Sequence, residues 1–342
     1  MNIVLLALDG NLPSGLVGLA DVFWLAGKAS ALQPDAPRWP CEVILASPDG
    51  RAVTDGRGRP LPVDAALHDI PHADAVIVPG LMPAGDGLPP RNAQTARAAT
   101  WLRRQHAHGA WVLGNCSGVF VLGEAGLLNG RRCTTTWWLN DELKHRFPRC
   151  DAAWGSALIE DGRVVTAGGP MSWIDLALYT IRVLVGPKAA RIAADFAVID
   201  TAPLAQSVYV PPGHVQARDP FLVAAEIAVR GHRADVALTP CALAAQLATS
   251  ERTLLRRLKN LGQQSSKTFI SRVQLESART LLETDSAAVK AVAQHCGWRD
   301  EGSFRRAFVR HTGMTPTAYR VWARQRRGDV TSSDACSTSA SE

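Results

Sequence analysis

Two helix-turn-helix patterns in tandem lie near the carboxyl end of the sequence, and they constrain the fold more than any other feature. The first covers residues 243–261 and the second covers residues 289–311. Between them, residues 268–283 carry apolar side chains at helical spacing and predict a connecting helix. In both patterns the second helix has an apolar face and a polar, basic face, so it can pack on its own domain while it enters a major groove. The sequence therefore predicts an all-α domain with two helix-turn-helix units.

Basic and polar side chains fall on the outer faces of the two second helices. In the first unit, Ser250 is a good N-cap, and Leu254 and Leu258 follow the helical period on the inner face. In the second unit, Phe304 and Phe308 are predicted to point inward. The side chains predicted to contact DNA are Arg252, Arg256, Lys259, Arg299, Ser303, Arg306 and Arg310. Since most protein–DNA contacts go to the backbone, an arginine at a helix end or edge is more often a phosphate contact than a base contact.

This tandem pattern resembles the DNA-binding domain of AraC/XylS-family transcription activators over roughly ninety residues. Its most specific element is Gly313-Met-Thr-Pro316 after the second unit. Family members usually carry Phe where Trp298 stands, a change that should keep the packing. A basic helical bundle that acts as a protein adaptor is the alternative, and it fits a lone helix-turn-helix pattern better than two with this connector. The other matching residues are Ala244-Ala245, Leu254, Arg257, Ala278-Arg279, Leu281-Leu282, Val292-Ala293, Cys296-Gly297, Ser303-Phe304, Arg306, Phe308 and Tyr319-Arg320.

The net charge of +6 is unevenly distributed along the chain. Residues 221–327 hold 18 Lys and Arg against 8 Asp and Glu, a net charge of +10, whereas residues 1–220 hold 19 against 20. A neutral first part with a strongly basic second part matches a carboxy-terminal domain that faces phosphates. Membrane-surface proteins can show the same skew, but they lack the helix-turn-helix turns.

Several other classes of protein do not fit the sequence. No run of eighteen uninterrupted apolar residues exists, so no membrane span is predicted. The amino terminus lacks a basic segment and is predicted to be a first strand instead of a signal peptide. Seven cysteines without a C-x-x-C pair suggest neither a disulfide framework nor a zinc site. We expect a cytoplasmic protein that binds no metal and no cofactor.

Strands and helices alternate through the first two hundred residues. This alternation predicts a doubly wound α/β domain with a mostly parallel sheet over residues 1–200. A proline-rich linker is predicted over residues 201–222, an AraC-type domain over residues 223–327, and a disordered tail over residues 328–342. The predicted strands cover residues 2–8, 41–47, 75–80 and 110–114, with a hairpin near residues 158–166; the predicted helices cover residues 16–29, 95–108, 119–125, 172–185 and 189–198.

Gly114-Asn-Cys-Ser-Gly118 lies where a predicted strand becomes a helix. Small flanking residues allow a sharp turn that places the side chain of Cys116 at the carboxyl edge of the sheet. Free N–H groups and the helix dipole favour a thiolate or a bound anion there, and ligands bind at this edge in open α/β sheets. Three interpretations of Cys116 stay open: a small buried apolar residue, a ligand contact, or a redox-sensing thiol.

Residues 1–190 resemble the PfpI-like branch of the class I glutamine amidotransferase fold. The resemblance is carried by Val78-Pro-Gly80, Cys116-Ser-Gly118, Leu122-Gly-Glu-Ala-Gly-Leu-Leu-Asn-Gly130 and Thr134-Thr135. Combined with the AraC-type domain, it is similar to the GlxA-type transcriptional regulators, which use the amidotransferase-like part as a sensor.

A catalytic thiol needs a base and a group that orients that base. Where enzymes of the PfpI branch commonly carry a His this chain has Thr136, and where they carry a Glu it has Gly15. We therefore expect no catalytic residues and no enzyme activity. The alternatives are a cysteine-dependent hydrolase or amidase fused to a DNA-binding domain, and a purely structural first domain that only dimerises the second.

Aromatic side chains near the elbow suggest what the first domain binds. Trp side chains could hold a quaternary ammonium by cation–π attraction, and the resemblance implies effectors such as amines or betaines. The alternative interpretation is that each Trp is an ordinary core residue. The resemblance implies a transcription activator that binds double-stranded DNA and a small-molecule effector, acts as a homodimer, works with RNA polymerase and needs no membrane. The predicted ligand contacts are Gly80, Cys116, Ser117, Trp137, Trp138, Met171 and Trp173.

Overall fold

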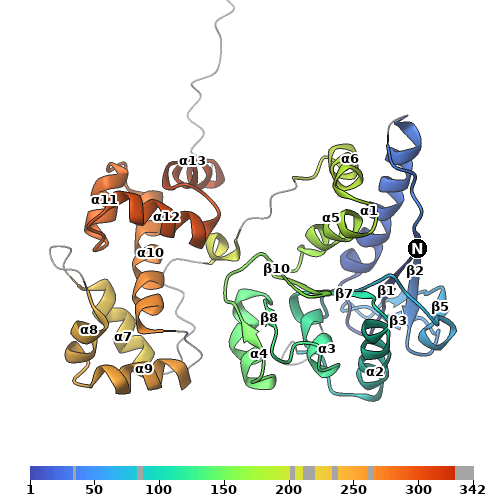
Figure 1. The fold of residues 1–342 in the computed structure, drawn as a ribbon, viewed down its shortest axis with the longest axis horizontal. Helices are drawn as coiled ribbons and strands as arrows, with labels where there is room; N and C mark the ends of the chain where they lie inside the picture. The colour runs from blue at the N-terminus through green and yellow to red at the C-terminus, as the bar shows by residue number, and fades with distance from the viewer. Residues whose placement is uncertain are drawn as a thin grey trace, which may run out of the picture. The chain divides into compact units, whose positions relative to one another are not determined.

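The chain divides into two compact units, Met1–Val208 and Tyr209–Glu342 (Figure 1). The predicted tail, residues 328–342, and residues 201–204 and 211–219 of the predicted linker lie outside the described residues. Within that linker, the described segment 205–210 contains a helical turn, and a helix already begins at Pro220. The computed structural model describes residues 1–33, 36–82, 88–200, 205–210, 220–232, 238–260 and 265–327.

The first unit is built on a seven-stranded sheet. Only β10 runs antiparallel, against β11, and the remaining pairs of neighbours are parallel. This topology confirms the predicted doubly wound, mostly parallel sheet. The strand order is β10 (Leu158–Asp161), β11 (Val164–Ala167), β7 (Trp111–Asn115), β6 (Ala75–Val78), β1 (Asn2–Leu6), β2 (Glu42–Ser47) and β5 (Ala65–Ala66). Two short two-stranded sheets accompany it: β3 (Val53–Thr54) with β4 (Pro60–Leu61), and β8 (Arg132–Cys133) with β9 (Asp151–Ala152).

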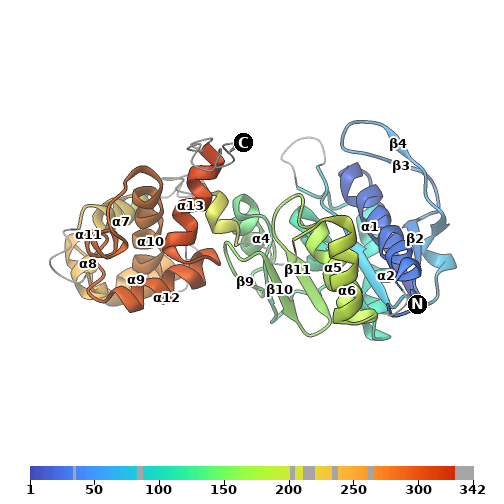
Figure 2. The same cartoon turned by 90° about the horizontal axis from the view of Figure 1, so that it is seen from above.

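Helices cover both faces of the large sheet, as Figures 1 and 2 show. Ile3 and Leu5 of β1 point into one core, and Val4 and Leu6 point into the other. This alternation explains the continuous apolar run at the amino terminus, because a strand buried on both faces needs apolar side chains at every position. The first core is shared with α1 (Pro13–Leu32), α5 (Trp173–Leu184) and α6 (Pro187–Ala197), and the second with α2 (Ala93–Ala107), α3 (Val119–Glu124) and α4 (Asn140–Arg146).

Helix α1 is the one helix in the described part of the chain that is long and apolar enough to cross a membrane by length and composition. Its Leu16, Leu19 and Phe23 side chains are buried in the core that it shares with α5 and α6. This packing is that of a core helix in a doubly wound domain.

The second unit is all-α and contains two helix-turn-helix units joined by a long helix, as predicted (Figure 1). The predicted connector is α10. Phe269 and Val273 near its start pack with the first helix-turn-helix unit. In the second unit, Phe308 contacts Phe304 in a tilted arrangement and Tyr319 edge to face. The helices are α7 (Pro220–Arg230), α8 (Pro240–Gln246), α9 (Glu251–Asn260), α10 (Ser266–Thr284), α11 (Val289–His295), α12 (Glu301–Thr312) and α13 (Pro316–Arg327).

Ion pairs fasten α7 to α10. Arg272 contacts Glu226 on α7 at 3.1 Å and Glu276 on its own helix at 2.7 Å. Arg230 completes the network with a 3.0 Å contact to Glu276. Both carboxylate side chains are buried, so the network keeps two negative charges paired inside the unit.

Candidate effector site and nucleic-acid interface

The turn after β7 forms the predicted elbow at the carboxyl edge of the sheet. Cys116 has a φ of +53°, a left-handed conformation that non-glycine residues rarely adopt. Its N–H donates to Gly168 O at 3.1 Å, and its carbonyl accepts the Thr135 hydroxyl at 2.7 Å. A Cβ at Gly118 would lie 2.3 Å from the carbonyl oxygen of Val78, so the elbow packs tightly on the end of β6.

Burial determines the protonation state of the Cys116 thiol. The side chain is almost completely buried, and burial raises its pKa, although hydrogen bonds from Ser117 oppose the effect. The sequence suggested a thiolate favoured by the helix N-terminus. That expectation fails because loss of hydration outweighs the local dipole in a site this enclosed. The thiol is therefore protonated at neutral pH.

Two of the predicted ligand contacts build the elbow. The Ser117 hydroxyl donates to Leu81 O at 2.5 Å and accepts from Leu81 N–H at 2.7 Å. A Cβ at Gly80 would stand 3.2 Å from Cys116 Cβ, so the glycine lets the loop after β6 pass close to the cysteine. Asn11 reaches the same loop, since its Nδ2 donates to Pro79 O and Gly80 O. Three loops thus meet next to β1, where the strand order reverses and open α/β sheets bind ligands.

Several buried polar atoms at this edge have no hydrogen-bond partner among the described residues. They include Asn115 Oδ1 beside the cysteine, Thr136 Oγ1, and Asn140 Oδ1 at the start of α4. The indole N–H of Trp173 also has no hydrogen-bond partner among the described residues. Because buried polar groups are nearly always hydrogen-bonded, these atoms are suited to a polar ligand or to water. Sequence analysis did not single out Asn115 or Asn140 as site residues; their burial was the missing information.

Gln206 is a further site residue that the sequence did not reveal. Its buried amide accepts Trp137 N–H at 2.9 Å and donates to Thr135 O and Ser156 O, both at 2.8 Å. A Cβ at Gly168 would lie 2.1 Å from the Gln206 amide carbon, so this side chain fills the space over β11. A glutamine in a proline-rich segment carries no signal of such an insertion.

The aromatic residues occupy different environments. Trp137 and Trp138 are in edge-to-face contact at 5.1 Å between ring centroids, and the side chain of Trp138 is 47% exposed. Met171 is also exposed. Trp173 instead packs on α1, where a Cβ at Gly18 would be 2.4 Å from its ring. The tryptophan pair therefore supplies an accessible aromatic surface, whereas the ring of Trp173 is fixed in the core.

The predicted DNA contacts lie on the outer faces of α9 and α12, except Arg299, which lies just before α12. On α9, Leu254 and Leu258 are buried and the predicted basic residues are exposed. On α12, Asp300 caps the helix by accepting Ser303 N–H, and Arg306 donates to the Ser303 hydroxyl at 3.0 Å. The exposed basic side chains are Arg252, Arg256, Lys259, Arg299, Arg306 and Arg310.

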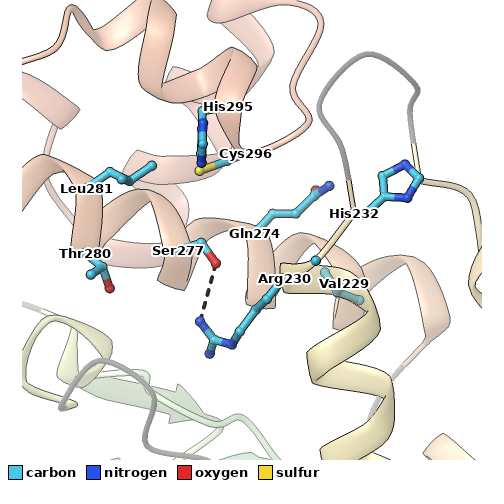
Figure 3. Close-up of a pocket in the computed structure, with 10 residues that line it drawn as sticks. Val229, Arg230, His232, Gln274, Ser277, Thr280, Leu281, His295 and Cys296 are labelled. Carbon is cyan, nitrogen blue, oxygen red and sulfur yellow. Dashed lines mark hydrogen bonds between the residues drawn. The ribbon is translucent and has the colours of Figure 1, made fainter.

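A cleft of about 570 Å³ in the second unit lies beside the connecting helix (Figure 3). His232 after α7 and His295 at the end of α11 stand on opposite sides of Gln274 and Ser277 of α10. Arg230 donates to the Ser277 hydroxyl at 3.4 Å across it. Residues of α7, α10 and α11 thus line the cleft.

Comparison with known proteins identifies both units. A helix-turn-helix domain model matches residues 243–321, and a DJ-1/PfpI family model matches residues 27–182. The transcriptional regulator CdhR of Pseudomonas aeruginosa is 27% identical over 87% of this chain and 89% of its own. The chain belongs to the AraC-type transcriptional regulators with a DJ-1/PfpI domain. The regulator GlxA of Rhizobium meliloti is 28% identical over 68% of this chain and 72% of its own.

The DJ-1/PfpI fold of this regulator also occurs in enzymes. Isonitrile hydratase of Pseudomonas putida is 32% identical over 45% of the chain and 68% of its own length. In the regulator, a Cβ at Gly15 would lie 2.9 Å from Pro79 Cβ, which leaves no room for a Glu there without movement. Thr136, at the place of the His, is fully buried and cannot act as a base. Among the described residues, no group of three or more His, Cys, Asp or Glu could hold a metal ion.

A histidine whose Nε2 atom is buried should make the regulator's DNA-binding unit sensitive to acid. Burial, together with the nearby charges of Arg279 and Arg272, lowers the pKa of His311 to about 3. Between about pH 6.5 and pH 3 the unfolded chain binds a proton that the folded unit does not, so stability falls as pH falls. At pH 5.5 the loss relative to pH 7.5 should be about 1 kcal/mol.

Urea unfolding at the two pH values measures this loss. His311→Gln should remove it, whereas His295→Gln, at an exposed histidine, should retain it. An equal pH dependence in wild type and His311→Gln would contradict the assignment.

Proposed function

We propose that this regulator is a one-component activator whose first unit binds a small metabolite at the elbow and whose second unit binds operator DNA. The observation that carries the sensor proposal is a set of buried, unpartnered oxygens: those of Asn115 and Thr136, in the two segments that meet at the protonated Cys116, and that of Asn140 at the start of α4. A site with this polarity, with Thr136 and Gly15 at the places of the His and Glu that would serve a catalytic thiol, suits binding better than catalysis. We infer the activator role, the homodimer, RNA polymerase as partner and the cytoplasmic location from the AraC/XylS resemblance.

A binding and transcription assay tests this function. Purified protein would be mixed with genomic fragments and a small panel of amines and betaines. Specific DNA binding that a compound changes supports the sensor. Specific binding that no compound changes would leave the first unit as a scaffold. Turnover of an isonitrile or amide that is lost in Cys116→Ser would instead establish an enzyme.

The effector proposal rests on the Trp137–Trp138 pair. Its aromatic surface next to polar oxygens suits an amine or betaine, since a ring face attracts a cation. We expect Trp137→Ala to weaken binding of glycine betaine or carnitine about tenfold. Calorimetry on wild type and variant measures the change. Trp24→Ala is the control, because Trp24 is 61% exposed and lies on α1. Absence of heat with the wild type removes this ligand class.

Arg256 is the proposed base contact on α9. It is exposed, and no carboxylate among the described residues pairs with it. Arg256→Ala should weaken operator binding by about 1–3 kcal/mol if it reads a base. Fluorescence anisotropy at one fixed salt concentration measures the affinity.

The matched control for this DNA-binding measurement is Arg305→Ala on α12. Arg305 is engaged by Glu301 at 2.6 Å and is not a predicted contact. Equal affinities and footprints of wild type and Arg256→Ala would refute the role of Arg256.

A further inference from the structure

Two cysteines of the first unit lie side by side near the elbow. Cys133 ends β8, and Cys150 immediately precedes β9. The two strands pair in parallel with Cys133 opposite Ala152, and Cys150 lies two residues before Ala152 in the turn that leads into β9. The thiols of Cys133 and Cys150 hydrogen-bond to each other.

Backbone hydrogen bonds hold this pair in register. Gly130 N–H donates to Arg149 O at 2.8 Å before the cysteines, and Ala153 N–H donates to Cys133 O at 2.8 Å after them. Cys150 itself lies outside the strand and donates its N–H to Phe147 O in a turn. The half-buried Cys150 can therefore shift toward the buried Cys133 without breaking the ladder.

We propose that Cys133 and Cys150 are a redox site that forms a reversible intramolecular disulfide on exposure to a peroxide. Cys150 reacts first, because it is partly exposed and peroxide can reach it. The hydrogen bond from Cys133 lowers the pKa of Cys150, and nearby Lys144 lowers it further against the effect of burial. Burial raises the pKa of Cys116 and Cys296, which makes those thiols poor nucleophiles.

The reaction is a two-electron oxidation of the two thiols. The Cys150 thiolate attacks one peroxide oxygen, the O–O bond breaks, and the leaving hydroxide takes up a proton to become water. The hydrogen bond to Cys150, burial and the Cys150 charge raise the pKa of Cys133 while both thiols are reduced. Conversion of Cys150 to a sulfenic acid removes that negative charge, and the sulfur of Cys133 then attacks the sulfur of the sulfenic acid. The S–O bond breaks, and the departing hydroxide combines with the Cys133 proton as a second water. One peroxide is thereby reduced to two waters.

The Cys133–Cys150 disulfide would form next to the proposed effector site and could change the affinity for the effector. Cys133 is followed at once by Thr134, whose N–H donates to the Thr166 hydroxyl of β11, and by Thr135, which donates to the Cys116 carbonyl. Linking Cys133 to Cys150 fixes this strand beside the elbow. This consequence for effector affinity rests on the proposed function, whereas formation of the disulfide does not.

Peptide mapping of the reduced, full-length protein tests the proposal without DNA or effector. After hydrogen peroxide, alkylation and trypsin, we expect peptides 133–144 and 150–163 to appear as one linked species, lighter by two hydrogens than their sum. Dithiothreitol should separate them. Recovery of both peptides fully alkylated, or of Cys150 linked to any other cysteine, overturns the proposal.

Variants separate the two roles. Cys133→Ala should leave Cys150 as a sulfenic acid that dimedone captures, and Cys150→Ser should leave Cys133 alkylated after peroxide. Cys241→Ser, at an exposed cysteine, should still form the linked species. Substitution of Cys133, a core residue, can itself destabilise the protein, so a second test leaves both cysteines in place. The rate at which Cys150 is alkylated should fall severalfold from wild type to Lys144→Met. An unchanged rate in Lys144→Met contradicts the assignment of Cys150 as the reacting thiol.

Discussion

Arg272→Ala should destabilise the DNA-binding unit by about 3–5 kcal/mol, because two buried carboxylates lose one of their two arginine partners. Arg272 contacts Glu226 and Glu276, whose side chains are only 5% and 7% exposed. Removing the guanidinium leaves Glu226 with the longer contact to Arg230, at 3.7 Å. Since whole domains are stable by about 5–15 kcal/mol, the variant should lose much of its helical structure near body temperature. Urea unfolding followed by circular dichroism measures the loss.

The control is an ion pair of the same spacing on the surface. Arg305 and Glu301 are also four residues apart and 2.6 Å from each other, but their side chains are 45% and 32% exposed. Arg305→Ala should therefore cost less than about 1 kcal/mol. Combining Arg272→Met with Glu226→Gln and Glu276→Gln should recover most of the loss, because no charge is then buried without a partner. Equal costs for Arg272→Ala and Arg305→Ala would contradict the explanation.

The sequence predicted those parts of the fold that repeat a period. Ile3 and Leu5 against Val4 and Leu6 required a strand covered on both faces, and the sheet has this arrangement. The glycines around Cys116 predicted the elbow, and its φ of +53° confirms a sharp turn. In these elements the local sequence pattern matches the burial in the fold, so the pattern alone predicts the element.

Other features depend on contacts between distant parts of the chain. Glu276 is of a residue type that is typical of a solvent-exposed helix face. Its burial is explained by its ion pairs with Arg230 and Arg272. Cys133 and Cys150 meet through two strands of two residues each, too short to show a period. Gln206 crosses to Thr135 from a segment with no pattern of its own. No local rule encodes such pairings, so they had to come from the structure.

Gly118→Ala should cost the first unit about 3 kcal/mol or more, although the change would stabilise an ordinary helix interior. Gly118 has φ −58° and ψ −26°, a conformation that alanine adopts readily. Helix propensity alone therefore predicts a gain of up to about 1 kcal/mol. The new methyl group, however, would lie 2.3 Å from Val78 O and 2.6 Å from Pro79 O. Val78 O belongs to the end of β6 and Pro79 O to the loop that carries Gly80, and neither backbone atom can rotate away.

Whether Gly118→Ala lowers or raises the stability of the first unit shows whether packing or helix propensity dominates at this position. Gly169→Ala is the matched control, because its methyl group would meet only the Ser172 hydroxyl, at 3.7 Å, and it should change stability by less than about 0.5 kcal/mol. Calorimetric unfolding of the full chain measures both variants, and operator binding shows whether the second unit stays folded. Movement of Pro79 should also displace Gly80 from Cys116 and weaken effector binding. A Gly118→Ala protein that melts at or above the wild-type temperature would show that the elbow is loosely packed.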